Sequence, residues 1–349
     1  DLSYRGPIRE KGIPNVFNVF DLDNTKKKAR QDEWQEQTQS VFASVEVGWK
    51  SMLYLTLTGR NDWASQLANS STPCFFYPSV GLSGVISEML TLPEFIDYMK
   101  VRGSFSSVGM PYPRNLTSPT YEYDEANQQW KPKTHYPIKD LKPERTNSWE
   151  LGLDMRLFKD FSLGFSWYLA NTFNQTFDPK VSVSSGYSKI YLQTGYVRNS
   201  GVELSLGYGH TWNNHLHWES NFTLSHNKNT IKDLVTSYIH PETGLPITQN
   251  RLDVGGLGKA RFILKKGGTL GDLYTQSDLK RDNNGMVEID PSGALTTEDN
   301  LPDIKLGSVF PKANLAWNNR FEWRGISLSA LFTARIGSVW SVRTFGTSP

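Results

Sequence analysis

The chain is 349 residues long, with a formal net charge of +2, 38% hydrophobic residues and 13% aromatic residues. This balanced charge gives no reason to expect an acidic or nucleic-acid partner, and a single cysteine, Cys74, excludes an internal disulfide and a cysteine-based metal site. No apolar stretch approaches the roughly 20 residues of a transmembrane helix. The aromatic content suits rings at a membrane interface better than a compact aliphatic core.

Short segments that alternate apolar with polar or small residues recur along the chain. In residues 149–157, Trp, Leu and Met side chains fall on one face, and Glu, Gly, Asp and Arg on the other. A soluble sheet buries its apolar face under a second layer, whereas a transmembrane barrel turns it to lipid. In chain order we expect strands at 40–48, 51–60, 76–86, 97–108, 146–157, 161–171, 196–208, 216–227, 259–265, 269–275, 313–323 and 326–336.

The connections between these strands are of two kinds. Short turns are expected at 48–51, 159–160, 211–215, 266–268 and 323–325. Long polar connections are expected at 61–75, 109–145, 172–195, 228–258 and 276–312, with a link of middling length at 87–96. Short and long connections alternate, as an up-and-down barrel with short periplasmic turns and long external loops requires. A Greek-key sandwich has no reason to sort its loops in this way.

Large rings cluster beside the short turns, where an aromatic girdle at the periplasmic interface belongs. These rings are Trp49, Phe158, Phe161, Trp212, Trp218 and Trp323. Strand alternation also predicts which side chains face lipid, namely Leu53, Leu55, Leu57, Leu151, Leu153, Phe165, Leu204 and Leu328. It predicts that Glu150, Asp154, Glu203 and Ser327 face the lumen. The fold class is therefore all-β, part of a large antiparallel up-and-down transmembrane β-barrel with long extracellular loops.

No arrangement of residues in the sequence points to catalysis. His215 and His217 have a spacing compatible with metal ligands, but they flank a turn beside Trp212 and Trp218, where polar-tipped rings belong in any case. We therefore predict that the chain is not an enzyme, and that it has no catalytic residue, no metal site and no cofactor.

One long connection carries candidates for substrate binding. Residues 110–136 hold several aromatic rings among Pro and Asn, and of these we name Tyr121, Tyr123 and Trp130. Exposed rings interleaved with amides suit sugar faces or peptide side chains. The alternative is that the rings pack the loop against itself or against a partner subunit, because a loop of this length needs a small core of its own.

Several segments resemble the SusC/RagA family of TonB-dependent outer-membrane transporters of Bacteroidetes. The blocks Thr58–Trp63 (Thr-Gly-Arg-Asn-Asp-Trp) and Lys142–Asn147 (Lys-Pro-Glu-Arg-Thr-Asn) are the most specific. The other matching stretches are 40–49, 55–63, 76–83, 101–109, 141–152 and 198–204. Their order and spacing fit the C-terminal part of the family's barrel. The family often has an acidic turn near Arg281–Gly285, which here lacks the Asp spacing of a calcium loop, so we expect a plain turn.

The resemblance implies a barrel of about 22 strands with a plug, in the outer membrane of a Bacteroidetes-like bacterium. Residues 1–349 would be one barrel segment, with the plug and the closing strands outside this chain. The implied partners are the lipid bilayer, a SusD-like surface lipoprotein and TonB, reached through a segment outside this chain. The implied activity is import of oligosaccharides or oligopeptides as the barrel of a SusCD-like complex. A passive outer-membrane channel and a secreted β-rich carbohydrate-binding protein stay as alternatives.

Overall fold

The computed structural model describes residues 2–5, 28–31, 35–68, 70–113, 116, 121–124, 129–132, 135–136, 141–177, 189–190, 192–212, 215–234, 238–239, 246–247 and 250–339. The chain divides into two compact units, residues 1–38 and 39–349. In the first unit, β1 (Leu2–Arg5) and β2 (Lys28–Gln31) form an antiparallel pair. None of the helices in the described segments combines the length and the apolar character that a membrane crossing requires.

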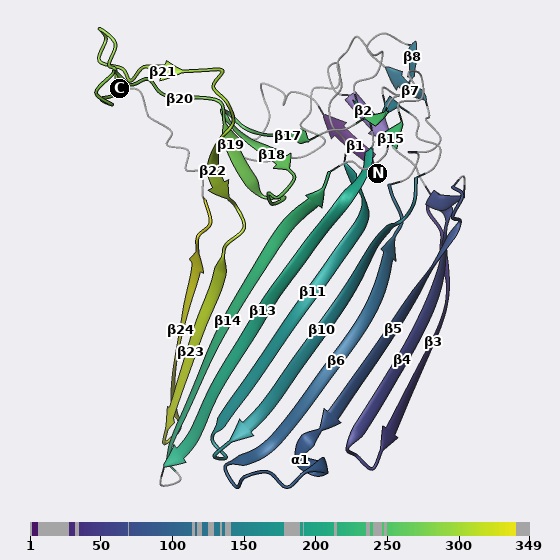
Figure 1. Ribbon diagram of the computed structural model, residues 1–349, viewed down its shortest axis with the longest axis vertical. Coiled ribbons are helices and arrows are strands. Elements are labelled where there is room, and N and C mark those ends of the chain that lie inside the picture. Colours follow the sequence, from purple (N-terminus) through teal and green to yellow (C-terminus); the bar gives the residue numbers. More distant parts are fainter. Residues whose placement is uncertain are drawn as a thin grey trace, which may run out of the picture. The chain divides into compact units, whose positions relative to one another are not determined.

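The second unit is built on a ten-stranded sheet in which each strand lies beside its neighbours in chain order (Figure 1). Its strands are β3 (Thr38–Trp49), β4 (Leu53–Ala64), β5 (Cys74–Val85), β6 (Ile96–Met110), β10 (Glu144–Leu157), β11 (Phe161–Phe177), β13 (Leu192–Trp212), β14 (Leu216–Asp233), β23 (Ala313–Trp323) and β24 (Ile326–Ile336). The paired strands run antiparallel, so the sheet is an up-and-down meander, as the sequence predicts.

The connections at the two ends of this sheet differ in length, and the three longest lie at the same end (Figure 1). At the turn end lie the links 50–52, 158–160, 213–215 and 324–325, together with 86–95, which contains α1 (Ile86–Met89). At the loop end lie 65–73, 111–143, 178–191 and 234–312. Positive φ angles at Arg324 and Gly325 give the mirror-image turn that suits the right-handed twist of a two-residue hairpin. Three of the four connections at the loop end are longer than every link at the turn end, but 86–95 is no shorter than 65–73, so the predicted segregation of short turns and long loops holds in part.

The strand register gives the sheet one apolar and one polar face. Leu153 pairs with Val101 of β6 and with Phe165 of β11. Phe165 pairs in turn with Leu204, which pairs with Leu224. Because directly opposed residues of antiparallel strands share a face, these side chains form one apolar row across five strands. We call this side the apolar face and the opposite side the polar face.

The alternation expected from the sequence agrees with this register. The residues predicted to share the apolar face do so, namely Leu53, Leu55, Leu57, Leu151, Leu153, Phe165, Leu204 and Leu328. The polar face carries Glu150, Asp154, Glu203 and Ser327. No second layer covers the apolar face in the described residues, because Leu151 is 56% exposed and Leu328 68% exposed. A soluble sheet would bury such side chains, so the exposure favours a face turned to lipid.

Two of the expected barrel strands belong to a different sheet. The expected strands 259–265 and 269–275 appear as β18 (Ala260–Lys265) and β19 (Asp272–Thr275). They pair with β17 (Arg251–Leu257) and β22 (Ile304–Ser308) in a four-stranded sheet inserted between β14 and β23. The prediction was wrong because alternation identifies a strand but not its sheet. Both strands are shorter than the 9–11 residues of a membrane-crossing strand.

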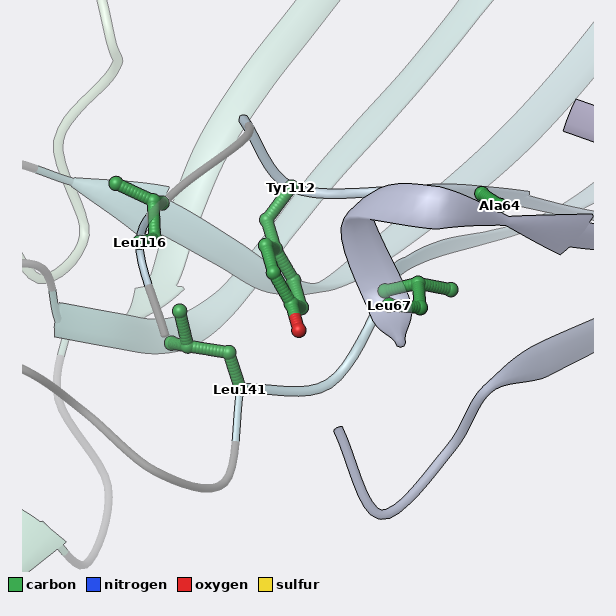
Figure 2. Packing of buried hydrophobic residues seen from close by; sticks show 5 residues of the cluster. All are labelled: Ala64, Leu67, Tyr112, Leu116 and Leu141. Atoms are coloured by element: carbon green, nitrogen blue, oxygen red, sulfur yellow. The ribbon is translucent and has the colours of Figure 1, made fainter. Parts of the chain in front are cut away.

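Small cores stabilise the connections at the loop end. In the first, Tyr112 lies among Leu67, Leu116 and Leu141, with Ala64 at the end of β4 beside it (Figure 2). The turn η2 (Ser65–Leu67) supplies Leu67. A second core joins the inserted sheet to β13 and β14, and consists of Val197, Ile231, Leu234, Leu252 and Leu264. The connections are therefore tied to the strand ends by buried apolar contacts.

The remaining strands are short pairs within the connections. They are β7 (Tyr121–Asp124) with β8 (Gln129–Pro132), β9 (His135–Tyr136) with β12 (Lys189–Ile190), β15 (Tyr238–Ile239) with β16 (Pro246–Ile247), and β20 (Asp278–Leu279) with β21 (Thr297–Glu298). The pair of β9 and β12 is parallel and links the connection 111–143 to the connection 178–191.

Candidate functional site: the polar face and the loop end

A charged cluster crosses the middle of the polar face. Arg102 of β6 donates from Nη1 to Glu150 Oε1 at 2.9 Å and from Nη2 to Ser166 Oγ at 2.6 Å. Its Nε lies 3.8 Å from Asp154 Oδ2. A Cβ at Gly152 would come within 2.4 Å of that Nε, so the glycine gives the guanidinium the room to lie across β10. The cluster therefore joins β6, β10 and β11 through fixed charges.

A second charged cluster lies on the same face toward the loop end, inside the Thr58–Trp63 block. Arg60 Nε donates to Asp62 Oδ1 at 2.7 Å, and its Nη2 donates to Ser40 Oγ at 3.0 Å. The Tyr77 hydroxyl donates to Asp62 Oδ2 at 3.1 Å. Phe75 packs edge-on against Tyr77, with ring centroids 4.9 Å apart, and also contacts the core around Tyr112. The block thus ties the strand ends to the folded loops.

Sequence reasoning did not single out Arg60 or Arg102 as candidate site residues. Both are arginines within strands, at positions that alternate with the apolar ones. This position in the sequence could have identified them as lumen-facing residues, since a charge inside a membrane-crossing strand is expected to face the lumen. Asp62, one partner of Arg60, is on the same strand, but Ser40 and all the partners of Arg102 come from other strands, so only the register brings these groups together.

The Lys142–Asn147 block also has a structural role. An ion pair between Glu144 and Arg145 at the rim is the expectation from adjacent opposite charges, but Arg145 is bonded elsewhere. Its Nε donates to Ser107 Oγ at 2.7 Å and its Nη2 to the Phe76 carbonyl at 3.4 Å. The ladder between β5 and β6 ends at Ser79 and Ser106. Arg145 therefore bridges β5 and β6 where they are no longer paired.

The substrate-binding candidates from the sequence lie on one hairpin. Tyr121 and Tyr123 are in β7, and Trp130 is in β8, where it pairs with Tyr123. The register therefore places the three positions on the same face of the hairpin. Their side chains lie outside the described part of the structure. Tyr112, from the same connection, is 3% exposed and packs in the first loop core, as the packing alternative expects for this one ring.

The polar residues considered as metal ligands are engaged in local hydrogen bonds. His217 Nδ1 lies 2.9 Å from Thr211 Oγ1, across the hairpin of β13 and β14. Asp282 Oδ1 accepts the backbone N–H groups of Asn284 and Met286 at 2.8 and 2.9 Å, which closes the turn that the sequence predicts. No group of three or more His, Cys, Asp or Glu side chains suited to a metal ion occurs in the segments that the structure describes.

A continuous row of rings crosses the apolar face at the turn end. Each ring contacts the next in the order Phe158, Phe161, Tyr208, Trp218 and Phe321. The distances between successive ring centroids are 6.4, 4.7, 5.2 and 5.6 Å. Two cations from the turns lie over other rings at this end of the sheet. Lys50 Nζ lies 5.0 Å from the centre of the Trp49 ring, and Arg324 lies 5.6 Å from that of Trp323. Such a row has the composition of an interfacial girdle.

The apolar band on β10 is somewhat shorter than the apolar band of roughly 25 Å that outer-membrane barrels carry. It runs from Trp149 to Leu157, which at a tilt of about 40° corresponds to roughly 20 Å of membrane thickness. Beyond it on the same face, toward the loop end, Asn147 pairs with Asn171, and Asn171 Oδ1 accepts a bond from Arg198 Nε at 3.0 Å. The polar residues mark the loop-end limit of the band.

The inserted sheet is stabilised by its own ion pairs. Asp303 accepts from Arg251 Nε at 2.7 Å and Nη2 at 3.0 Å, and Lys265 Nζ lies 2.9 Å from Asp303 Oδ2. The hydrogen bonds from Arg251, with the charge of Lys265, hold the pKa of this carboxyl well below its usual range. Asp272, with no exposed side-chain surface, is bonded to Lys305 at 2.6 Å. These pairs fix a sheet whose strands are too short to be stable alone.

Comparison with known proteins places these features in a family. The family described as "TonB dependent receptor-like, beta-barrel" matches residues 2–285. TonB-dependent receptor P39 of Formosa agariphila is 24% identical over 271 residues, covering 74% of this chain and 23% of that protein. TonB-dependent receptor P26 of the same organism is 24% identical over 352 residues, covering 93% of this chain and 34% of that protein.

A solved structure shows the same fold. The RagAB peptide transporter superposes with a TM-score of 0.70 at 20% identity, covering 93% of this chain and 35% of that chain. The chain thus spans between about a quarter and about a third of the length of these relatives. The up-and-down sheet, its apolar and polar faces and the aromatic row are those of a transmembrane barrel. The chain belongs to the TonB-dependent receptor family, of whose β-barrel it is a part.

Proposed function

We propose that the chain forms part of the wall of a TonB-dependent importer of oligomeric nutrients, either glycans or peptides. The observation that carries the proposal is the ten-stranded sheet with an uncovered apolar face, a polar face rich in charges, and all long connections at one end. Such a wall separates lipid from a polar passage and offers an external surface to cargo. It guides and binds without covalent chemistry, so we infer that the chain is not an enzyme.

We also propose that residues 1–349 act as one segment of a larger barrel. The sheet has two edge strands, β3 and β24. Unpaired strand edges are not tolerated in lipid, so strands from elsewhere in the whole protein complete the wall. The resemblance to SusC/RagA proteins supports a plug domain outside this chain.

The proposed setting is the outer membrane of a Bacteroidetes-like bacterium. Membership of the TonB-dependent receptor family and the two relatives from Formosa agariphila support it. By the same resemblance, a SusD-like surface lipoprotein covers the loop end, and TonB acts through a segment outside residues 1–349. Within the loops, we propose the hairpin of β7 and β8, with Tyr121, Tyr123 and Trp130, as a contact for cargo.

The test uses the whole protein in its own bacterium. Cells receive fluorescent oligopeptides or oligosaccharides, and uptake is compared between the intact gene and one lacking the TonB-contacting segment. An importer loses uptake on this deletion while surface binding persists. Uptake that does not depend on that segment indicates a passive channel instead. Recovery of the protein in the medium rather than the outer-membrane fraction indicates a secreted binding protein.

A further inference from the structure

The polar face of β3, β4, β5 and β6 contains a hollow toward the loop end. Its volume is about 570 Å³, and its lining includes Phe42, Thr58, Arg60, Tyr77 and Ser106. The loop core around Tyr112 borders it, since Phe75 contacts both that core and Tyr77. Cargo that enters from the loop end therefore meets this hollow near the start of the polar passage.

Arg60 is held in the hollow by a buried carboxylate. The Asp62 side chain is 7% exposed, whereas that of Arg60 is 52% exposed. Both Asp62 oxygens are engaged, one by Arg60 Nε and the other by the Tyr77 hydroxyl. The bond from Arg60 Nε to Asp62 thus orients the guanidinium of Arg60. Arg60 lines the hollow, and among the described residues its Nη1 has no hydrogen-bond partner while its Nη2 has one, Ser40 Oγ.

The rest of the lining suits an elongated polar ligand with an apolar side. Ser44, Thr58, Ser79 and Ser106 contribute hydroxyls, and none of these forms a hydrogen bond with another described residue. Phe42 is 76% exposed, although it lies on the otherwise polar face. An open aromatic ring beside free hydroxyls offers packing and hydrogen bonds at once.

We propose that this hollow is a binding subsite for a carboxylate-bearing segment of the cargo. The planar edge of the Arg60 guanidinium matches a carboxylate in a two-bond arrangement. The hydroxyls then bind neighbouring polar groups, and Phe42 packs against the apolar side of the same segment. The proposal rests on the import function above. The carboxylate belongs either to a peptide or to a uronic acid of a glycan, which share this chemistry.

The subsite is tested in the full-length protein purified with its partner in detergent. The probes are a tetrapeptide with a free C-terminus, the same peptide as its C-terminal amide, an oligogalacturonate and a neutral oligosaccharide of equal length. Binding is measured by calorimetry for wild type, for Phe42→Ala and for Arg60→Gln combined with Asp62→Asn. The double variant avoids leaving Asp62 buried without its cation, which is costly.

Arg320→Gln combined with Glu322→Gln serves as the matched control. Arg320 lies on the polar face of β23 and pairs with Glu322, two residues along the strand as in Arg60 and Asp62. The hollow includes neither residue. Because each double variant removes an arginine and its paired carboxylate from the same face, a general effect of losing such an ion pair should appear in both.

We expect the double variant to bind the carboxylated probe of one class about tenfold more weakly, as for a lost bond to a charged group. The double variant should bind the amide or neutral counterpart as wild type does, and Arg320→Gln combined with Glu322→Gln should bind every probe as wild type does. Phe42→Ala should weaken the binding of both members of that probe pair. The probe class that responds identifies the source of the carboxylate. Unchanged affinity in the double variant, an equal loss for the uncharged counterpart, or no binding by wild type overturns the subsite. Import by wild-type cells tests the proposed function separately.

Discussion

Neighbouring residues on one strand of this protein face different media, and the register assigns each to its side. Leu204 pairs with Phe165 and Leu224 on the apolar face, whereas Ser205 pairs with Gly164 and Thr223 on the polar face. Small residues recur opposite large polar ones. The Tyr168 ring, for example, lies where a Cβ at position 201 would be, 2.5 Å from that atom. The polar face is therefore shaped by glycine and serine, and not by charge alone.

Leu204→Arg and Ser205→Arg form a matched pair for the two faces. Leu204 lies near the middle of the apolar band, so an arginine there should destabilise the folded barrel by about 2–4 kcal/mol. Ser205 lies on the polar face, in a hollow whose charged lining residues are Asp154, Glu203 and Arg335, so an arginine there should cost much less. Urea unfolding of the full-length protein in lipid vesicles measures both. An equal or larger cost at 205 would show that the faces are assigned the wrong way round.

The pair of Arg251 and Asp303 predicts a pH dependence confined to the inserted sheet. The pKa of Asp303 is lowered in the folded state, so its contribution is complete above the unfolded carboxyl pKa of about 3.9 and declines as the pH falls toward the folded value. Amide exchange in residues 251–308, corrected for its intrinsic pH dependence, should show constant protection between pH 8 and 5 and weaker protection below pH 4. Asp303→Asn should weaken it at every pH, whereas Asp299→Asn, in an exposed pair with Lys259, should not. Equal effects of the two variants would contradict this account.

At the scale of elements, the sequence predicts the ten barrel strands but not the sheet to which every strand belongs. The expected hairpin at 146–157 and 161–171 matches β10 and β11, because each strand has a full apolar stripe. In the inserted sheet, Leu264 of β18 packs in a small core with Ile231 of β14, and every residue of β19 is buried. The predicted alternation of the two ends of the barrel is unaffected by this error. Two strands fewer is an even number, so the connections before and after the inserted sheet still lie at the same end. The short length of the two expected strands was the signal that could have excluded them from the barrel.

The hairpin of β7 and β8 is the element for which two hypotheses predict different affinities for cargo. In the first its rings bind the cargo, and in the second they only pack the loop. Replacing Tyr121, Tyr123 and Trp130 with Ala together should lower the affinity of the assembled complex for its cargo if the rings bind it, by roughly 1–3 kcal/mol for lost stacking. Barrel levels in the membrane should stay normal. Unchanged affinity would mean that the rings only pack the loop. Tyr112→Ala is the comparison, because Tyr112 is in the loop core.

The candidate sites show where sequence reasoning ends. The blocks around Arg60 and Arg145 identify the family, yet their partners, Tyr77, Ser107 and Ser40, come from other strands. Only the register brings these groups together, and no local pattern specifies them. The aromatic row was predictable because its position beside short turns is itself a property of the sequence.

At the scale of the molecule, we propose that strands outside the 349-residue chain complete the sheet. Among the described strands, β3 and β24 are the two open edges of the sheet. The apolar face needs lipid or detergent to cover it. We therefore expect the isolated polypeptide in detergent to show no cooperative unfolding transition by circular dichroism, whereas the full-length protein shows one. A sharp transition for the isolated chain would mean that the segment closes on itself.

The central claim is that the ten-stranded sheet spans a membrane, with alternate residues in lipid and in a polar passage. Spin labels at successive positions from 149 to 157, in the full-length protein with Cys74 replaced and reconstituted in vesicles, test it most directly. Odd positions should be accessible to oxygen in lipid, and even positions to a water-soluble nickel complex, with a period of two residues. Uniform access of the nickel complex to every position, or the opposite phase, would contradict the account.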